Sequence, residues 1–247
     1  MNKIIKAILT ASATMLCMLT IFSVHAGDGP LAYYSFDGIA RDGSGNGNDG
    51  TLAGGSSYST GIFGQAVSLD GIDGRVELPV IFTQDQDPMT VAFWVNPAST
   101  PRAPSIFGEF NHYDGSTRNQ VVIGENWIQF DQYGPSGGVA RINEGLNEND
   151  IGNWVHIVVV KEAEEVSFYK DSIFLGSLAH TETYSGRAPD LAAIGARKIN
   201  GSWTYNNSAY NFHGLVDEVY IYDRALTQYE IKDLYNSGNK CCVCICN

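Results

Sequence analysis

The chain has 247 residues, with 27 acidic and 15 basic side chains and a formal net charge of −12. Because nucleic-acid binding relies on Lys and Arg to neutralise phosphates, this charge argues against a nucleic-acid partner. Glycine is abundant, at 27 residues, and aromatic residues make up 11% of the chain; this balance favours short strands joined by tight turns over helix bundles.

The first 26 residues have the pattern of a secretory signal peptide. Lys3 and Lys6 form a basic start, an uncharged apolar run follows, and Val24-His25-Ala26 is a small-residue cleavage site. We therefore expect cleavage near Ala26 and a secreted, periplasmic or cell-surface location. The alternative is an uncleaved anchor, since the run approaches the ~20 residues that a membrane span requires. We expect no membrane span in the mature chain.

Strand patterns then recur along the chain. Residues 37–51 are dense in Gly, Asn and Asp, which predicts turns. Residues 89–96 alternate cleanly, with Val91, Phe93 and Val95 on one face, and Trp94, on the other face, is also expected to be buried. We expect further strands at 31–36, 65–69, 75–78, 105–110, 121–124 and 127–132.

The second half begins with residues 134–149, which we interpret as a Gly- and Asn-rich connection containing Arg141. Residues 154–161 (WVHIVVVK) form the strongest strand pattern. The strands 166–169 and 173–177 flank Lys170-Asp171-Ser172 in a hairpin, and 194–197 is a short strand. Next comes a loop rich in aromatic and amide side chains, KINGSWTYNNSAYN.

The closing stretch predicts a strand followed by the chain's one clear helix. Thr227 is a good N-cap, and Glu230 three residues later completes a capping box. Leu226 and Ile231 occupy the positions of a hydrophobic staple, and Gly238 is placed to end the helix. The apolar stripe of this helix consists of Ile231, Leu234 and Tyr235.

This order of elements predicts an all-β fold: an antiparallel two-sheet β-sandwich, or jelly roll, with one short C-terminal helix. We expect a signal peptide at 1–26, one jelly-roll domain at 28–238 and a Cys-rich tail at 239–247. The tail could hold a soft metal, form local disulfides, link a disulfide-bonded partner or have no fixed role. Its cysteines are Cys241, Cys242, Cys244 and Cys246.

Five segments, in order, resemble the laminin G-like jelly-roll domains of the concanavalin A-like lectin/glucanase superfamily. They are YYSFDG with DGSGNGNDGTL, FGQAVSLDGIDGRVELP, MTVAFWVNP, NWVHIVVVK with the VSFYKDSIFLGS hairpin, and AAIGAR with FHGLVDEVYIYDRALTQYEI. The resemblance implies two antiparallel sheets packed face to face, one of them with a concave face. Such hairpins usually carry Asp-Gly where this chain has Lys170-Asp171-Ser172, so we expect a different turn type there.

The resemblance also bears on catalysis. Enzymes of this superfamily are similar in carrying an E-x-D-x-x-E or E-x-D-x-E run on one concave strand, where two carboxylates act as acid and nucleophile. This chain has no such run. Glu109, Glu125 and Asp131 could approach one another only through folding. We therefore expect a non-catalytic module, with a polysaccharide-active hydrolase or lyase as the alternative.

A structural Ca²⁺ ion is implied by the resemblance, because many relatives hold one between the early Phe-Asp turn and the closing Val-Asp-Glu strand. The matching positions here are Asp37 and Asp217. Hard cations prefer carboxylates and backbone carbonyls, and the loop at 43–50 could supply the carbonyls.

Carbohydrate is the expected ligand of an exported sandwich with aromatic loops. Sugar rings stack their apolar faces on Trp and Tyr, and amides bond their hydroxyl groups. A cell-surface protein is the alternative partner, which would make the domain a protein–protein interaction or adhesion module. The candidate binding residues are Trp127, Tyr133, Trp203, Tyr205, Asn206 and Asn207.

Overall fold

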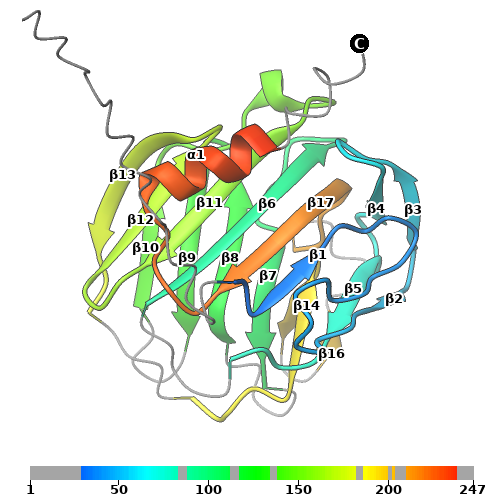
Figure 1. Cartoon of the computed structure of the whole chain (residues 1–247), viewed down its shortest axis with the longest axis horizontal. Helices are drawn as coiled ribbons and strands as arrows, with labels where there is room; N and C mark the ends of the chain where they lie inside the picture. Colours follow the sequence, from blue (N-terminus) through cyan, green and yellow to red (C-terminus); the bar gives the residue numbers. More distant parts are fainter. Residues whose placement is uncertain are drawn as a thin grey trace, which may run out of the picture.

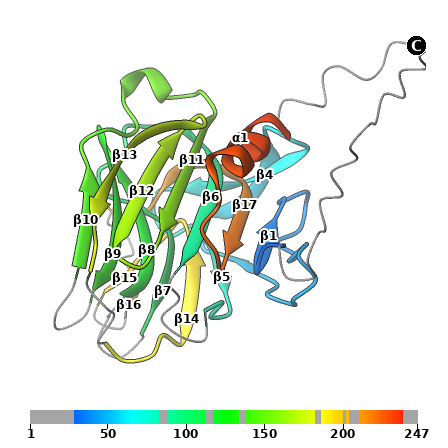
Figure 2. The same cartoon turned by 60° about the vertical axis from the view of Figure 1, so that its left-hand side comes forward.

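In the computed structural model, two antiparallel sheets pack face to face, and one helix lies across the outside of one sheet (Figures 1 and 2). The structure describes residues 29–82, 88–111, 117–133, 138–181, 186–199, 202–203 and 210–237. The expected signal peptide, Gly238 and the Cys-rich tail lie outside these residues. Within them, no helix has the length and apolar character needed to cross a membrane.

The first sheet has eight strands. In spatial order they are β13 (Ile173–Ala179), β12 (Glu165–Lys170), β11 (Val155–Lys161), β6 (Met89–Pro97), β17 (His213–Tyr222), β4 (Gln65–Asp70) and β3 (Ser56–Thr60), with β1 (Ala32–Tyr34) also paired to β17. The last strand therefore pairs with the first: Ala32 lies opposite Ile221. The strongest strand pattern, β11, lies inside this sheet.

The second sheet has seven strands. In order they are β10 (Gly138–Ile142), β9 (Trp127–Tyr133), β8 (Thr117–Gly124), β7 (Ser105–Phe110), β14 (Leu191–Ile194), β5 (Arg75–Leu78) and β2 (Thr51–Ala53). A small third sheet pairs β15 (Lys198–Ile199) with β16 (Ser202–Trp203), and a 3₁₀ turn spans Glu148–Asp150. Figure 2 shows the two large sheets as separate layers.

One apolar core fills the space between the two sheets. The alternation in β6 is as predicted, because Val91, Phe93 and Val95 are fully buried there. The opposite face of β6 is covered by α1 (Gln228–Ser237), under which Ala92, Leu226 and Ile231 form a second apolar cluster. The expected jelly-roll sandwich with one C-terminal helix is confirmed.

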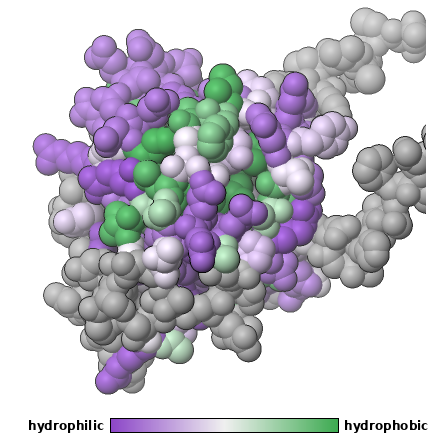
Figure 3. All heavy atoms as spheres, turned by 90° about the vertical axis from the view of Figure 1, so that its left-hand side faces the viewer, coloured by the Kyte–Doolittle hydropathy of each residue, from purple (hydrophilic) through white to green (hydrophobic). Residues whose placement is uncertain are grey.

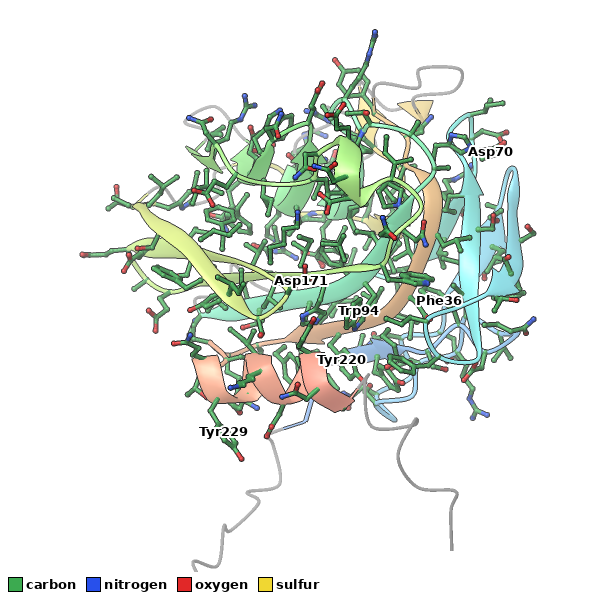
Figure 4. The ribbon with its side chains drawn as sticks, turned by 90° about the horizontal axis from the view of Figure 1, so that it is seen from above. Phe36, Asp70, Trp94, Asp171, Tyr220 and Tyr229 are labelled. Carbon is green, nitrogen blue, oxygen red and sulfur yellow. The ribbon has the colours of Figure 1, made fainter. Side chains whose placement is uncertain are left out.

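The N-terminus of α1 is the predicted capping box. The Glu230 N–H donates to Thr227 Oγ1 at 3.3 Å, and the Thr227 N–H donates to Glu230 Oε2 at 2.8 Å. Further along the helix, the Tyr235 ring stacks on Trp94, with centroids 5.4 Å apart. Figure 4 shows Trp94 and Tyr220 on the side of the sheet that faces α1, and Tyr229 pointing away from it.

Replacing Thr227 by Ala should lower the free energy of unfolding by about 1 kcal/mol, because the Glu230 N–H loses its acceptor. Urea denaturation at pH 7 measures this loss. Thr227→Ser keeps the hydroxyl and serves as the control, since it should retain most of the stability. A Thr227→Ala midpoint equal to that of the unchanged chain would contradict the role of the cap.

Three local expectations need correction. The region 134–149 is not only a connection, because β10 forms within it and pairs with β9. The strand expected at 194–197 lies instead at Leu191–Ile194. The hairpin turn also keeps the geometry typical of Asp-Gly: Asp171 and Ser172 both have positive φ, 51° and 64°, as a type I′ turn requires.

Candidate functional site

The outer face of the seven-stranded sheet carries polar side chains on β9 and β10. Along β9, Ile128 and Phe130 are fully buried in the core. Because side chains alternate along a strand, Gln129 and Asp131 point to the opposite face. On β10, Arg141 lies directly opposite Gln129 and therefore shares that face.

These side chains form a connected network. Arg141 Nε donates to Gln129 Oε1, and Gln129 Nε2 donates to Asp131 Oδ1. The Arg141 guanidinium also lies 4.2 Å from the ring centroid of Trp127, at the start of β9. We refer to Trp127, Gln129, Asp131 and Arg141 as the platform. It combines an aromatic ring with amide, carboxylate and guanidinium groups.

A glycine on β8 makes room for the indole of the platform. Gly124 pairs with Trp127 across the strands, and a Cβ atom at Gly124 would fall 2.1 Å from Trp127 Cε2. Any side chain at Gly124 would therefore displace the ring. With Gly124 on one side and Arg141 stacked on the ring, the half-buried indole is held in place, and the exposed Arg141 remains in contact with solvent.

Asp131 is the buried end of the network, with a relative exposure of 3%. The pKa of its carboxyl group is raised to about 6. Burial raises it, and this outweighs the hydrogen bond from Gln129 and the charges of Arg197 and Arg141, which lower it. Arg197 immediately precedes β15, the partner of the strand that carries Trp203. The charge of Arg197, next to β15, therefore acts on the platform.

The structure places the predicted binding residues to different extents. Trp127 is half-buried in the platform. The backbone of Tyr133 ends β9, and the backbone of Trp203 pairs with Lys198 in the β15–β16 ladder. The side chains of Tyr133 and Trp203 lie outside the described part of the chain, as do the whole residues Tyr205, Asn206 and Asn207.

Glu109, named above for the enzyme alternative, has a structural environment. It is fully buried on β7. Its Oε1 accepts hydrogen bonds from the N–H groups of Ile81 and Phe82, both at 2.9 Å, and its Oε2 accepts one from Arg118 Nε at 3.0 Å. Burial raises the pKa of Glu109, and the charge of Arg118 lowers it. A carboxylate with both oxygens bonded inside the protein is poorly placed to reach a substrate.

Asp37 and Asp217 hold the same loop from two sides. Asp37 Oδ1 accepts the Gln65 N–H at 2.8 Å, and Asp217 Oδ2 accepts the N–H groups of Ile62 and Phe63 at 3.0 and 3.2 Å. We call Asp37, Asp217 and the loop 61–65 the aspartate clasp. The loop depends on Gly64, whose φ is +48° and whose added Cβ would fall 1.8 Å from Asp37 Oδ1.

A break in β17 places two carboxylates together at the clasp. The register of β17 against β6 shifts between Asp217 and Tyr220, and Glu218 has a positive φ of 49°. Glu218 accepts hydrogen bonds from the hydroxyls of Tyr33 and Tyr220. Asp217 is fully buried. Its pKa is raised to about 8, because burial, together with the charge of Glu218, outweighs the N–H donors, which lower it.

The two carboxylates of the clasp suit a hard cation in kind, and the backbone groups that contact them are N–H donors. This donor set is small, however. Nowhere in the described ranges do three His, Cys, Asp or Glu side chains form a group that could hold a metal ion. A Ca²⁺ ion takes six to eight oxygens, so Asp37 and Asp217 would supply only part of the shell, with further carbonyls expected from the loop at 43–50.

Comparisons with solved structures agree with this architecture. Domain 4 of AbnA, an extracellular arabinanase from Geobacillus stearothermophilus solved with arabinotriose, is 23% identical, with a TM-score of 0.66 over 84% of this chain and 98% of that one. The binding domain of botulinum neurotoxin DC in complex with rat synaptotagmin II is 16% identical, with a TM-score of 0.64 over 85% of this chain. The match spans 52% of that toxin domain, about half its length. At these identities the likeness establishes the fold.

A search of curated proteins returned no match. The family described as the concanavalin A-like lectin/glucanases superfamily matches residues 70–232, which is most of the described domain. The matched segment runs from the last residue of β4 into α1 and so includes most strands of both sheets and the platform, but not β1, β2 and β3. The chain therefore belongs to the concanavalin A-like lectin/glucanases superfamily, as a laminin G-like jelly-roll domain.

Proposed function

We propose that this domain is an exported, non-catalytic binding module that recognises carbohydrate at the platform. The observation that carries the proposal is the network from Arg141 through Gln129 to Asp131 beside the indole of Trp127. Its side chains are held by one another before any ligand arrives, which reduces the entropy lost on binding.

The chemistry of the platform suits a sugar. The exposed Arg141 has N–H groups besides Nε that can donate to hydroxyl or carboxylate oxygens. The indole of Trp127 supplies an apolar contact for the C–H groups of a sugar ring. The charge of Arg197, which precedes the strand paired with that of Trp203, acts on Asp131 and supports including Trp203 in the test. A neighbour of the same fold, the arabinanase domain, was solved with arabinotriose, which supports a carbohydrate ligand. The toxin binding domain was solved with a protein, which keeps the adhesion module as the alternative.

A glycan array followed by calorimetry on the best ligand tests the proposal. Arg141→Ala should weaken binding about 10-fold or more, since a hydrogen bond to a charged group contributes roughly 1.5–3 kcal/mol. Trp127→Ala should weaken it by a similar factor, and Trp203→Ala shows whether that region contributes. Tyr229→Ala removes an aromatic ring that is 74% exposed on α1 and serves as the control with unchanged affinity.

Two results would overturn the proposal. The first is an unchanged chain that binds no glycan in the presence of calcium. The second is a glycan whose affinity is the same for the unchanged chain, Trp127→Ala and Arg141→Ala, with circular dichroism showing all three folded. Capture of a cell-surface protein by the same face, lost in Arg141→Ala, would favour the adhesion module instead.

The proposal includes a structural Ca²⁺ ion at the aspartate clasp. Its support is the pair Asp37 and Asp217, which face one loop, and the burial of the Asp217 carboxylate, since a buried carboxylate gains most from a cation. The proposal also includes export through the signal peptide at residues 1–26, supported by its basic start, apolar run and small-residue cleavage site.

A further inference from the structure

A polar pocket of about 250 Å³ opens at the end of the sandwich that carries Trp127. Its walls come from the turn between β8 and β9, from the loop 143–147 after β10 and from the strands β12 and β13. In Figure 2 this loop rises above β12 and β13, and Figure 3 shows hydrophilic residues gathered at the same end of the molecule. We call this space the end pocket. Its lining includes Asn126, Asn143, Glu144, Lys170 and Leu175.

The lining of the end pocket combines amides, a carboxylate and an apolar side chain. The amides of Asn126 and Asn143 can donate and accept hydrogen bonds, as sugar hydroxyl groups also do, and Glu144 can accept them. Within the described residues, these three side chains have no hydrogen-bond partner, so they are available to a ligand. The half-buried Leu175 adds an apolar surface for the C–H groups of a sugar ring. This combination matches one sugar unit.

The charges of the end pocket favour a neutral sugar. Lys170 Nζ lies 2.7 Å from Asp150 Oδ2, so its charge is balanced by that carboxylate. Glu144 is exposed and has no ion-pair partner in the described part of the chain, so it repels the carboxylate or sulfate of an acidic glycan. A neutral sugar avoids this repulsion and can still donate hydroxyl groups to Glu144.

The walls of the end pocket are held in place before a ligand arrives. The Asn126 N–H donates to the Leu146 carbonyl at 2.7 Å, and Lys170 Nζ donates to the Gly145 carbonyl at 3.2 Å. Gly145 also packs against the backbone of the platform, because an added Cβ there would fall 2.5 Å from the Trp127 carbonyl oxygen. Walls that are already ordered reduce the entropy lost on binding.

The end pocket follows directly from the platform along the chain. Asn126 immediately precedes Trp127, and Asn143 follows Arg141 by two residues, which is a separation of at most about 7 Å. A sugar chain that packs one unit against Trp127 and Arg141 therefore has its next unit close to the amides of Asn126 and Asn143.

We propose that the end pocket is a second subsite of the carbohydrate site, which binds the adjacent unit of a neutral oligosaccharide. This role rests on the proposed function, since the platform holds the first unit. It narrows the ligand from carbohydrate in general to a neutral chain of more than one unit. Because the second unit adds contacts without a second loss of overall translational and rotational freedom, a longer chain should bind more tightly than a single sugar.

Calorimetry on the mature chain tests the subsite, with neutral oligosaccharides of one to six units of the sugar that the glycan array selects; NMR titration measures the weakly bound monosaccharide. The trisaccharide should bind about 10-fold more tightly than the monosaccharide, or better. Asn143→Ala should remove about 3- to 10-fold of this gain through one lost hydrogen bond and leave monosaccharide binding unchanged. Asn126→Gly should act in the same way, because Gly keeps the positive φ of 62° at that position.

Two control variants, checked for folding by circular dichroism, separate the subsite from the platform. Arg141→Ala should weaken the binding of every chain length, whereas Gln228→Ala, which removes an exposed amide on α1, should change none. The subsite is wrong if affinity does not rise with chain length, if Asn143→Ala and Asn126→Gly keep the full gain, or if the array selects acidic glycans alone. In these cases the platform still stands when Arg141→Ala weakens binding. A chain that binds no glycan overturns the platform and the subsite together.

Discussion

Arg118→Met should lower the free energy of unfolding by about 3–5 kcal/mol, the usual cost of leaving one partner of a buried ion pair alone. Arg118 bonds Glu109 Oε2 at 3.0 Å, and the side-chain exposures of the pair are 5% and 0%. Its guanidinium also donates to the carbonyl of Phe82. Urea denaturation at pH 7, followed by tryptophan fluorescence and circular dichroism, measures the loss.

Two further variants separate a structural role for Glu109 from a catalytic one. Adding Glu109→Gln to Arg118→Met removes the unpaired charge and should recover part of the lost stability. Glu109→Gln alone should leave glycan affinity unchanged once the protein is folded. If the unchanged chain turns over a polysaccharide and a stably folded Glu109→Gln variant does not, the enzyme alternative is supported instead.

In the absence of calcium, stability should fall as the pH rises from about 6 to 8. Burial raises the pKa of Asp217 to about 8 in the folded chain, against about 3.9 in an unfolded one. Between these values the folded state holds a proton that the unfolded state does not, so a rising pH favours unfolding. Differential scanning fluorimetry at pH 6, 7 and 8 with a chelator measures the slope, and Asp217→Asn should flatten it.

If the proposed Ca²⁺ ion binds the ionised carboxylate of Asp217, calcium should reverse this loss at pH 8. Asp37→Asn is the informative variant: it keeps an acceptor for the Gln65 N–H but removes a charge, so it should abolish the calcium response. Asp217→Ala is less specific, since the N–H groups of Ile62 and Phe63 lose their acceptor whether or not calcium is present. Asp233→Asn, exposed on α1, is the control. A calcium response of equal size in Asp37→Asn would remove the proposed site.

Elements with strong local patterns could be predicted from the sequence. The alternation of β6 and the capping box of α1 depend on neighbours within a few residues, so both can be recognised in the sequence. β10 is different, because its five residues, GVARI, follow a glycine-rich stretch and gain their strand character from pairing with β9. Beside the break at Glu218, Asp217 contacts Ile62 and Phe63, which lie far away in the sequence.

The candidate site shows the same division. Trp127 could be selected because its ring is of the kind that stacks on sugars. Its partner Arg141 lies in a stretch that looks like a loop, and only the register that places Arg141 opposite Gln129 brings it to the indole. The burial of Glu109 could not be predicted from the sequence either, because its ion pair with Arg118 depends on the pairing of β7 with β8.

The position of β17 has a consequence for how the chain folds. This last strand lies between β6 and β4, and β1 also pairs with it. The hydrogen bond from Ile62 to Asp217 joins residues 155 positions apart. Contacts of such long sequence separation form slowly, because a long loop must close before they stabilise anything. A nascent chain that has not yet reached residue 213 therefore holds two half-sheets with open edges, and its fold is completed only when the final strand arrives.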